Sequence, residues 1–245
     1  MKKRIVLGDP HGRWIPIIDI YNREQPDEVI ILGDYFDSFD IQPYEQKICY
    51  NNIIELRNEH IKKKKGNKFI MLIGNHDMHY MCPLFDRCSG WNSLTDSLVG
   101  YNLSKDWDKG ILKMCYIDEI NKTIYSHAGV TENWFNKWCS GSLGNIETLG
   151  IEYFNFTSKD GGDMYGSSSW NSPLWVRPSG LKESPYKDKD GITWSQIFGH
   201  TQKDMIDYWN INEGHFYGID CITKYYISEI IDDTGKLIER IINKR

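Results

Sequence analysis

Short apolar runs recur along the chain, and each is followed by glycine and polar residues. The run Phe69–Ile73 has the length and composition of a buried parallel strand, and it leads into Gly74-Asn75-His76-Asp77. Four other runs have the same form: residues 4–7, 28–32, 122–125 and 196–198. We therefore predict five strands with polar side chains at their carboxyl ends, where open α/β sheets build their sites.

Stretches with a helical spacing of apolar residues separate the first three predicted strands. Residues 14–23 place their apolar side chains on one face, and Pro43 opens a longer helix that ends near Gly66. This β-α-β-α-β order predicts a parallel sheet with right-handed crossovers. Three further segments follow, two expected to be helical and the middle one helical or irregular: residues 78–85, 91–105 and 130–140.

The second half of the chain has a different character. Residues 140–191 are rich in glycine, serine and aromatic residues, and we interpret them as a loop-rich insertion near the site rather than a separate domain. Beyond residue 193 the pattern predicts strands at residues 205–209, 215–219, 225–231 and 236–242. Together these elements predict a single α/β domain over residues 1–245.

Composition narrows the class of protein. The 245 residues suffice for one well-packed domain, 40% of them are hydrophobic, and the formal net charge is -5. This mild acidity gives no reason to expect binding to nucleic acid or to a membrane surface. The chain has no apolar run of about 18 residues and no secretory signal after its basic N-terminus, so we expect no membrane span and a cytoplasmic location.

The six cysteines form no Cys-x-x-Cys pair. Without a signal sequence we expect them to be reduced thiols, and disulfides remain the alternative for a secreted chain. The candidate metal ligands described next include no thiolate, which excludes a structural zinc site built from cysteines.

Residues that bind metal ions stand at the ends of the predicted strands. Asp9 and His11 are separated by one residue, so both could reach one ion, and Asp34 has two oxygens with which to bridge two ions. The candidate ligands that complete a second ion are Asn75, His127 and His200. Mixed imidazole and oxygen ligands suit Mn, Fe, Zn or Co better than Ca.

The same residues form an ordered series of motifs: Asp9-x-His11, Gly33-Asp34-x-x-Asp37, Gly74-Asn75-His76-Asp77, His127 and Gly199-His200. The series resembles the signature of the calcineurin-like metallophosphoesterases. Leu174–Pro178 and Phe198–Thr201 are similar to the phosphoprotein phosphatase branch, including its bacterial and phage members. The resemblance implies a β-sandwich flanked by helices, with two divalent ions at the strand ends, manganese being expected.

The resemblance also implies a role for each residue. The metal ligands would be Asp9, His11 and Asp34 for one ion and Asp34, Asn75, His127 and His200 for the other. A hydroxide that bridges the ions would attack phosphorus. His76 would protonate the leaving oxygen, and Asp37 would orient His76, in agreement with the use of a positioned imidazole as an acid near neutral pH.

Two positions depart from the family pattern. Ser38 stands where protein phosphatases usually carry an arginine, so one bidentate phosphate clamp is missing and Arg177 is the remaining candidate for substrate binding. Gln202 stands where nuclease-like and cyclic-nucleotide branches carry a second histidine, which disfavours those branches. We interpret His79, one turn after His76, as a surface residue of a helix.

The expected activity is metal-dependent hydrolysis of phosphomonoesters, with a phosphoprotein as the phosphorylated substrate, as in serine/threonine phosphatases. The missing arginine keeps hydrolysis of nucleotides or dinucleoside polyphosphates as the alternative. A phosphodiesterase and a non-catalytic binding module are less favoured, because the metal ligands and His76 are intact. The sequence does not indicate an oligomeric state.

Overall fold

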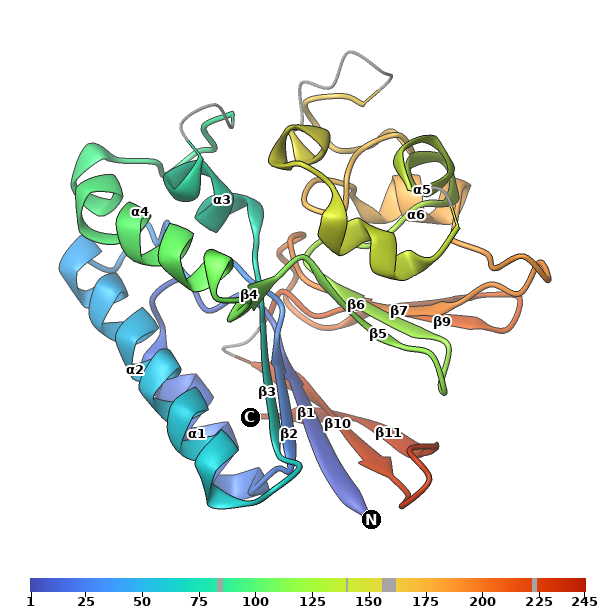
Figure 1. Cartoon of the computed structure of the whole chain (residues 1–245), viewed down its shortest axis with the longest axis horizontal. Coiled ribbons are helices and arrows are strands. Elements are labelled where there is room, and N and C mark those ends of the chain that lie inside the picture. Colours follow the sequence, from blue (N-terminus) through green and yellow to red (C-terminus); the bar gives the residue numbers. More distant parts are fainter. Residues whose placement is uncertain (83–85, 140, 156–161, 222–223) are drawn as a thin grey trace.

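Two β-sheets face each other at the centre of the molecule, and helices cover the outside (Figure 1). The computed structural model describes residues 1–82, 86–139, 141–155, 162–221 and 224–245. The first sheet has the strand order β11-β10-β1-β2-β3-β4, and the second has the order β5-β6-β7-β9-β8. The predicted fold class is confirmed.

The first sheet combines a parallel and an antiparallel part. Its strands are β1 (Lys2–Leu7), β2 (Glu28–Ile31), β3 (Lys68–Leu72), β4 (Leu112–Lys113), β10 (Tyr225–Ile231) and β11 (Leu237–Lys244). The strands β1 to β4 are parallel, and β10 pairs antiparallel with β1, so that Val6 lies between Ile30 and Ile227. The C-terminal hairpin thus extends the sheet formed by the N-terminal β-α-β units.

The second sheet has a parallel centre with antiparallel edges. Its strands are β5 (Cys115–Asp118), β6 (Thr123–Ser126), β7 (Ser195–Phe198), β8 (Asp207–Ile211) and β9 (Gly214–Gly218). The central strands β6, β7 and β9 run parallel to one another, and β5 and β8 run antiparallel at the edges. The carboxyl ends of three strands therefore meet at one edge of this sheet.

Alternation of side chains along the strands builds two apolar layers. Val6 and Ile30 point toward the second sheet and share one buried cluster with Tyr125 and Ile197. Ile5, one residue away, points to the opposite face, where it joins the cluster that contains the helix α1. Each fully buried aliphatic side chain contributes about 1.5–3 kcal/mol, so both faces of the first sheet stabilise the fold.

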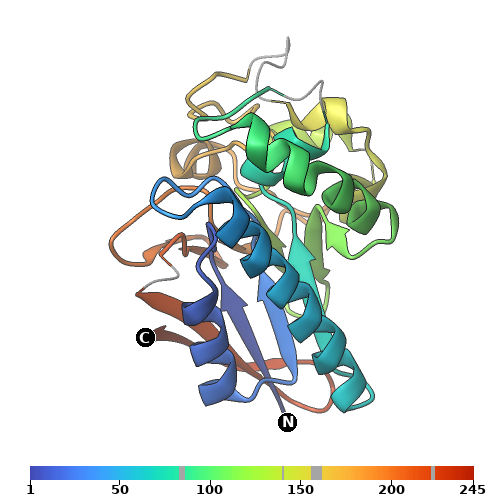
Figure 2. The same cartoon turned by 90° about the vertical axis from the view of Figure 1, so that its left-hand side faces the viewer.

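Helices lie across the outer face of the first sheet and above both sheets. They are α1 (Trp14–Glu24), α2 (Pro43–Lys63), α3 (Asn75–Met81), α4 (Ser93–Asp108), α5 (Glu132–Trp138), α6 (Pro178–Glu183) and the 3-10 helices η1 (Leu143–Thr148) and η2 (Ile151–Phe154). Figure 2 shows α1 and α2 in front of β1 and β2, as expected for right-handed crossovers.

The predicted elements are present, with three differences. The helix expected from residue 78 begins at Asn75, because Asp77 accepts a hydrogen bond from Gly74 N–H and caps the first turn; residues 83–85 lie outside the described residues. Residues 93–108 are helical. The strands β4 and β5 were not predicted, because both are short and lack a clear apolar run.

The insertion at residues 140–191 contains η1, η2, α6 and loops in its described part; residues 140 and 156–161 lie outside it. It borders the strand ends, because Pro173 O accepts a hydrogen bond from Ala128 N–H at 2.7 Å. All six cysteines are free thiols. Within the described ranges, no helix is both long and apolar enough to cross a membrane.

Candidate active site

The predicted metal ligands come from the ends of five strands in two sheets. Asp9 and His11 follow β1, Asp34 follows β2, and Asn75 is the first residue of α3 after β3. His127 follows β6, and His200 follows β7. Because these strands are parallel within each sheet, their carboxyl ends meet at the same end of the sandwich.

The structure brings all six side chains together. Asp34 Oδ2 lies 3.8 Å from His11 Nε2 and 3.4 Å from His127 Nε2. Asn75 Oδ1 lies 2.8 Å from His127 Nε2 and 3.1 Å from His200 Nδ1. The backbone N–H of His200 donates to Asp9 Oδ2 at 2.7 Å, which joins the last ligand in the sequence to the first.

Two glycines allow the close approach of the strand ends. A Cβ at Gly74 would lie 2.0 Å from Asp34 Oδ1, and a Cβ at Gly199 would lie 1.9 Å from Asp9 Oδ1. Asp34 and His200 themselves adopt left-handed backbone angles, with φ of 56° and 64°. Such angles in non-glycine residues cost energy and gather at functional sites.

Asp77 ties two of these loops together. Its Oδ2 accepts hydrogen bonds from the backbone N–H groups of Asp34 (2.8 Å) and Gly74 (2.9 Å). Its Oδ1 accepts from Tyr35 N–H at 2.8 Å. The side chain is fully buried and makes its contacts with the backbone, so Asp77 holds the loops in place and does not face a ligand.

Each of three imidazoles lies against a backbone carbonyl and turns its other nitrogen toward the cluster. His11 Nδ1 lies 2.6 Å from Phe36 O, and His127 Nδ1 lies 2.9 Å from Leu32 O. His200 Nε2 lies 3.2 Å from Trp175 O. Since a carbonyl only accepts, the facing nitrogen carries the proton, and the other nitrogen presents a lone pair to Asp34 or Asn75.

Burial favours the neutral form of these rings. It lowers the pKa of His11 and of His127, although the charge of Asp34 opposes the shift. Burial lowers the pKa of His200 further, and the neighbouring His127 adds to the effect. A neutral imidazole with a free lone pair is the form that binds a metal ion.

The carboxylates of Asp9, Asp34 and Asp220 are crowded together. Asp9 Oδ1 is buried and has no hydrogen-bond partner in the part of the chain that the structure describes. Burial and the charges of Asp220 and Asp34 raise the pKa of Asp9. Acceptor atoms that face one another in this way, with Asn75 Oδ1 only 2.8 Å from a lone pair of His127, fit a site for metal cations.

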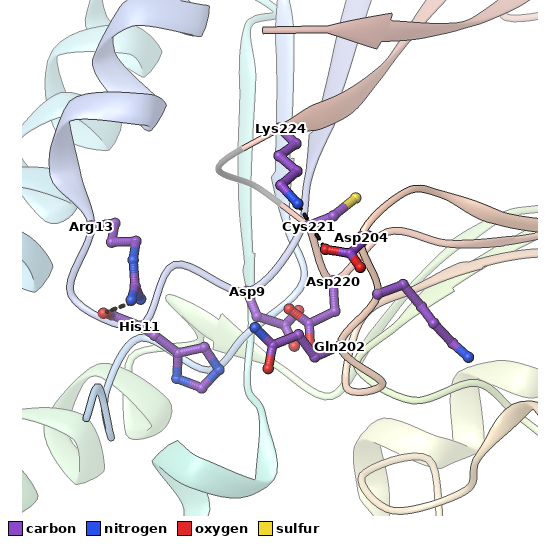
Figure 3. Close-up of a pocket in the computed structure, with 9 residues that line it drawn as sticks. Asp9, His11, Arg13, Gln202, Asp204, Asp220, Cys221 and Lys224 are labelled. Atoms are coloured by element: carbon purple, nitrogen blue, oxygen red, sulfur yellow. Dashed lines mark hydrogen bonds and ion pairs between the residues drawn. The ribbon is translucent and has the colours of Figure 1, made fainter. Parts of the chain in front are cut away.

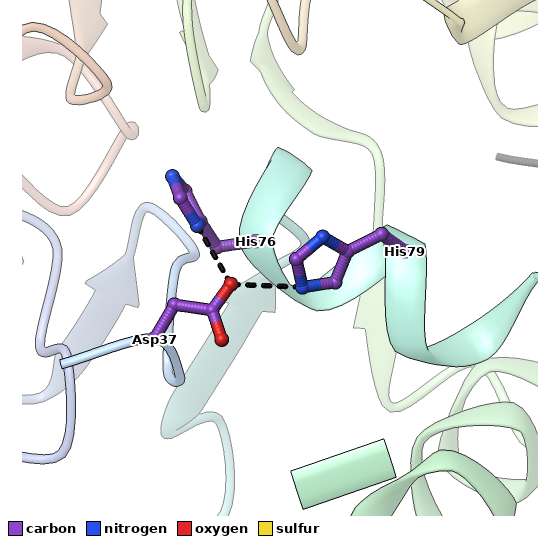
Figure 4. A group of neighbouring side chains, drawn as sticks. All are labelled: Asp37, His76 and His79. Carbon is purple, nitrogen blue, oxygen red and sulfur yellow. Dashed lines mark hydrogen bonds and ion pairs between the residues drawn. The ribbon is translucent and has the colours of Figure 1, made fainter. Parts of the chain in front are cut away.

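His76 and Asp37 form a hydrogen-bonded pair beside this cluster. His76 Nδ1 lies 2.8 Å from Asp37 Oδ2 (Figure 4). The imidazole rings of His76 and His11 stand edge to face, with their centres 5.5 Å apart. Burial would lower the pKa of His76, but the charges of Asp34 and Asp37 raise it to about 9. The ring is therefore charged at neutral pH and can donate a proton.

Arg177 lies at the rim of the site, at the N-terminal end of α6. Its Nε donates to Tyr165 O at 2.8 Å, and Nη1 lies 3.4 Å from Thr201 Oγ1, next to His200. Trp175 of the same segment is in edge-to-face contact with His200, with ring centres 6.0 Å apart. Arg177 is exposed, and its charge acts on His200, one of the predicted metal ligands.

Two cavities meet at the cluster and contain residues that the sequence analysis did not select. A cavity of about 310 Å³ lies over Asp34, Asp37 and His76, and a second of about 470 Å³ extends from Asp9 to Lys224. Arg13 and Asp220 line both cavities, and Figure 3 shows Asp220 beside Asp9.

The sequence contains a signal for both Asp220 and Arg13. Asp220 comes two residues after β9, which is parallel to β7, so it obeys the same rule of a carboxylate at a strand end. Burial and the charge of Asp34 raise its pKa to about 7. Arg13 directly follows the motif of Asp9 and His11, donates to His11 O at 3.1 Å, and pairs with Asp40 at 2.6 Å.

His79 is not a helix-surface residue as predicted. Its side chain is fully buried, and its Nε2 lies 2.8 Å from Asp37 Oδ2. The prediction was wrong because the face of α3 that carries His79 packs against the loop after β2, which the spacing within one helix does not reveal.

Comparison with known proteins agrees with this arrangement. The Shewanella-like protein phosphatase 1 of Plasmodium berghei (strain Anka) is 24% identical, over 89% of this chain and 66% of that protein, so the chain spans just under two thirds of its relative. Two solved structures share the fold. They are a cold-active protein-tyrosine phosphatase of a psychrophile Shewanella sp. (TM-score 0.61, 15% identity, 100% of this chain and 80% of that one) and a protein serine/threonine phosphatase from Saccharomyces cerevisiae (TM-score 0.57, 13% identity, 99% and 79%).

The family model for calcineurin-like phosphoesterases matches residues 2–218, which include every predicted metal ligand. This match covers far more than half of the chain, and it agrees with the two-sheet fold and with the gathering of the strand ends. The resemblance found in the motifs is thereby confirmed, and the chain belongs to the calcineurin-like phosphoesterase family.

Proposed function

We propose that this chain hydrolyses phosphate monoesters with two divalent metal ions held by the six strand-end residues. The observation that carries the proposal is the orientation of three neutral imidazoles, whose lone pairs face Asp34 and Asn75 beside a charged His76. When bound, such ions neutralise the charge of a phosphate and lower the pKa of a water molecule so that it attacks at neutral pH. The mixed donor set favours manganese, with iron, zinc or cobalt as alternatives.

The residues of the chain would divide the remaining work. Asp34 would be the shared ligand, because its carboxylate lies close to both His11 and His127. Asp9 and His11 would complete one ion, and the other ligands listed above would complete the second. His76, held by Asp37 through Nδ1, would donate the proton on Nε2 to the leaving oxygen. Arg177 would contact the outer phosphate oxygens.

A phosphoprotein is the proposed substrate. The motifs shared with the phosphoprotein phosphatase branch and the name of the curated relative support this class. Ser38 in place of an arginine keeps nucleotides and dinucleoside polyphosphates as the competing class. We propose that residues 1–245 act as one domain and that the location is cytoplasmic, as the sequence analysis expected.

A metal-reconstitution experiment tests the activity. The chain is stripped with a chelator, reloaded separately with Mn, Fe, Zn or Co, and assayed with p-nitrophenyl phosphate. We expect turnover only in the loaded protein, and we expect Asp34→Asn to lose metal content and activity together. Asp19→Asn, an exposed residue of α1, is the matched control. Two bound ions with near-normal turnover in Asp34→Asn would overturn the bridging role.

A substrate screen then separates the classes. The loaded protein is assayed with phosphoserine, phosphothreonine and phosphotyrosine peptides, mononucleotides, dinucleoside polyphosphates and phosphodiesters. The proposal predicts the highest kcat/KM for a phosphopeptide. A clear preference for dinucleoside polyphosphates or for diesters would overturn the proposed substrate while leaving the metal chemistry in place.

A further inference from the structure

A second histidine contacts the same oxygen of Asp37 as His76 does. Figure 4 shows the rings of both His76 and His79 in contact with Asp37. His76 Nδ1 and His79 Nε2 each lie 2.8 Å from Asp37 Oδ2, and the side chains of Asp37 and His79 are fully buried. Two imidazole nitrogens therefore contact one carboxylate oxygen, His76 through a hydrogen bond and His79 at the distance of an ion pair.

The protonation of His79 follows from its other nitrogen. The backbone N–H of Cys88 donates a hydrogen bond to His79 Nδ1 at 3.0 Å, so Nδ1 presents its lone pair. A neutral imidazole then carries its proton on Nε2, the atom that faces Asp37. The Nε2–H of His79 is thus in close polar contact with Asp37 Oδ2, a contact that is too bent to be a hydrogen bond.

This tautomer argues against a further metal site. Ligand atoms of Asp37, His76 and His79 lie within 4.8 Å of one another, which is close enough for one ion. A metal on His79 Nε2 would require the proton to move to Nδ1, where it would face the N–H of Cys88 at 3.0 Å. Two N–H groups in contact repel, so His79 Nε2 does not present a lone pair to a metal ion.

The other oxygen of Asp37 is also held. Tyr80 O–H donates to Asp37 Oδ1, and the same hydroxyl accepts from Asn92 N–H at 3.2 Å. The backbone of Gly90 approaches Asp37 closely, because a Cβ added at Gly90 would come within 2.9 Å of the Cβ of Asp37. Donors on both oxygens fix the plane of the carboxylate.

We propose that His79 is a positioning residue for the proton donor. By holding Asp37 Oδ2 in line with Nδ1 of His76, it fixes the direction in which His76 Nε2 points. The inference rests on the proposed function, in which Nε2 delivers a proton to the leaving oxygen. An alcohol leaving group needs that proton, whereas nitrophenolate leaves well without it.

The test compares two leaving groups in four variants of the metal-loaded chain. His79→Leu removes the polar contact with Asp37, and His79→Gln keeps an N–H at a similar reach. His76→Ala is the reference for complete loss of the acid. His60→Leu is the matched control, because His60 is also buried in the helical layer but contacts Tyr21 and Asp27 outside the site.

The expected result is a selective loss. His76→Ala should lower kcat for an alkyl phosphate by about 10²–10⁴-fold. His79→Leu should lower it by about 10- to 100-fold, as for other groups that orient a working residue, with a much smaller loss for p-nitrophenyl phosphate. His79→Gln should restore most of the alkyl activity, and His60→Leu should leave the ratio of the two rates unchanged.

The outcomes separate the two proposals. An unchanged alkyl-to-aryl ratio in His79→Leu, with the expected loss in His76→Ala, would overturn the role of His79 alone. No selective loss in His76→Ala would overturn the proposed function and this inference with it. One fewer metal ion in His79→Leu than in the wild type would also overturn it, by identifying His79 as a ligand.

A measurement on the folded wild-type chain avoids any failure of the variants to fold. Nitrogen-15 spectra of the imidazoles distinguish the two neutral tautomers. We expect the proton of His79 on Nε2, and a proton on Nδ1 would overturn the inference.

Discussion

Backbone carbonyls decide how the three metal-facing imidazoles are oriented. The acceptors for His11 and His127 are carbonyls of residues after β2, and the acceptor for His200 is a carbonyl of the loop before α6, so no side-chain substitution can remove them. The site therefore depends on the placement of loops as much as on the ligands themselves. Side chains that add charge at its rim, in contrast, can be changed singly, and two of them give direct tests.

Arg177 is the first of these side chains. Arg177→Lys keeps the charge but loses the planar fork that suits two phosphate oxygens. We expect kcat/KM for monoesters to fall about 10-fold, because a charge-assisted hydrogen bond contributes about 1.5–3 kcal/mol. Diesters, with one fewer charged oxygen, should be less affected. Metal content and unfolding should not change, and unaltered monoester kinetics would show that Arg177 is structural.

Arg13 is the second. The guanidinium of Arg13 pairs with Asp40, and Asp40 also accepts a hydrogen bond from Ser38 O–H at 2.6 Å. Arg13 therefore lies close to Ser38, the position at which protein phosphatases usually carry an arginine. We predict that Arg13→Gln raises KM for phosphate monoesters by about 10-fold, since one charge-assisted contact is lost. Steady-state kinetics measure this, with Arg245→Gln, whose ion pair with Asp19 is exposed, as the control. An unchanged KM would contradict the role.

At the scale of elements, the loops after β2 and β3 behave as one unit because Asp77 holds both. Three backbone N–H groups donate hydrogen bonds to its two carboxylate oxygens. One of these N–H groups belongs to Asp34, and another belongs to Gly74, the residue before Asn75. The loops can therefore shift only together. This makes Asp77 a structural residue whose loss should be felt at the metal ligands.

Asp77→Asn tests that coupling. An amide has one acceptor oxygen in place of two, so at least one buried N–H loses its partner, at a cost of about 1–3 kcal/mol. We expect a matching loss in the free energy of unfolding, measured with denaturant, and weaker metal binding, measured by titration. A variant with normal stability and normal metal affinity would show that the loops do not need this tie.

Prediction from the sequence was most successful for residues whose position depends on a single strand, namely those at the strand's carboxyl end. The five apolar runs are strands, and the residues after them converge, because parallel strands share a carboxyl edge. The burial of His79 could not be predicted, since it depends on how α3 packs against the loop of Asp37. The division into two sheets came from the resemblance, because β4 and β5, which begin the change of sheet, are too short to show a pattern.

At the scale of the molecule, a buried ion cluster joins the two sheets. Arg4 on β1 is 3% exposed and donates to Glu28 (2.9 Å), Asp118 (2.9 Å) and Glu229 (3.1 Å). Asp118 belongs to β5 of the second sheet, whereas the other two carboxylates belong to neighbouring strands of the first. One guanidinium thus neutralises charge on both layers.

Arg4→Met would leave those carboxylates without their shared partner. Removal of one member of a buried ion pair costs about 3–5 kcal/mol, because the remaining charge stays desolvated. We expect that loss in the free energy of unfolding, measured with urea, and little change in metal content of the folded fraction. A loss below about 1 kcal/mol would mean that Arg240, which also contacts Glu229 at 2.7 Å, is sufficient.

The place of β1 in the first sheet has a consequence for synthesis of the chain. One edge of β1 pairs with β2, which is synthesised soon after it. The other edge pairs with β10, where Val6 lies opposite Ile227, and β10 is synthesised near the end of translation. At ribosomal rates of about 5–20 residues per second, that second edge waits roughly 10–40 s for its partner. During this time an apolar strand offers open hydrogen-bonding groups to any neighbouring chain. The nascent protein is therefore most exposed to aggregation just before its last hairpin emerges, and a chaperone that covers this edge would act there.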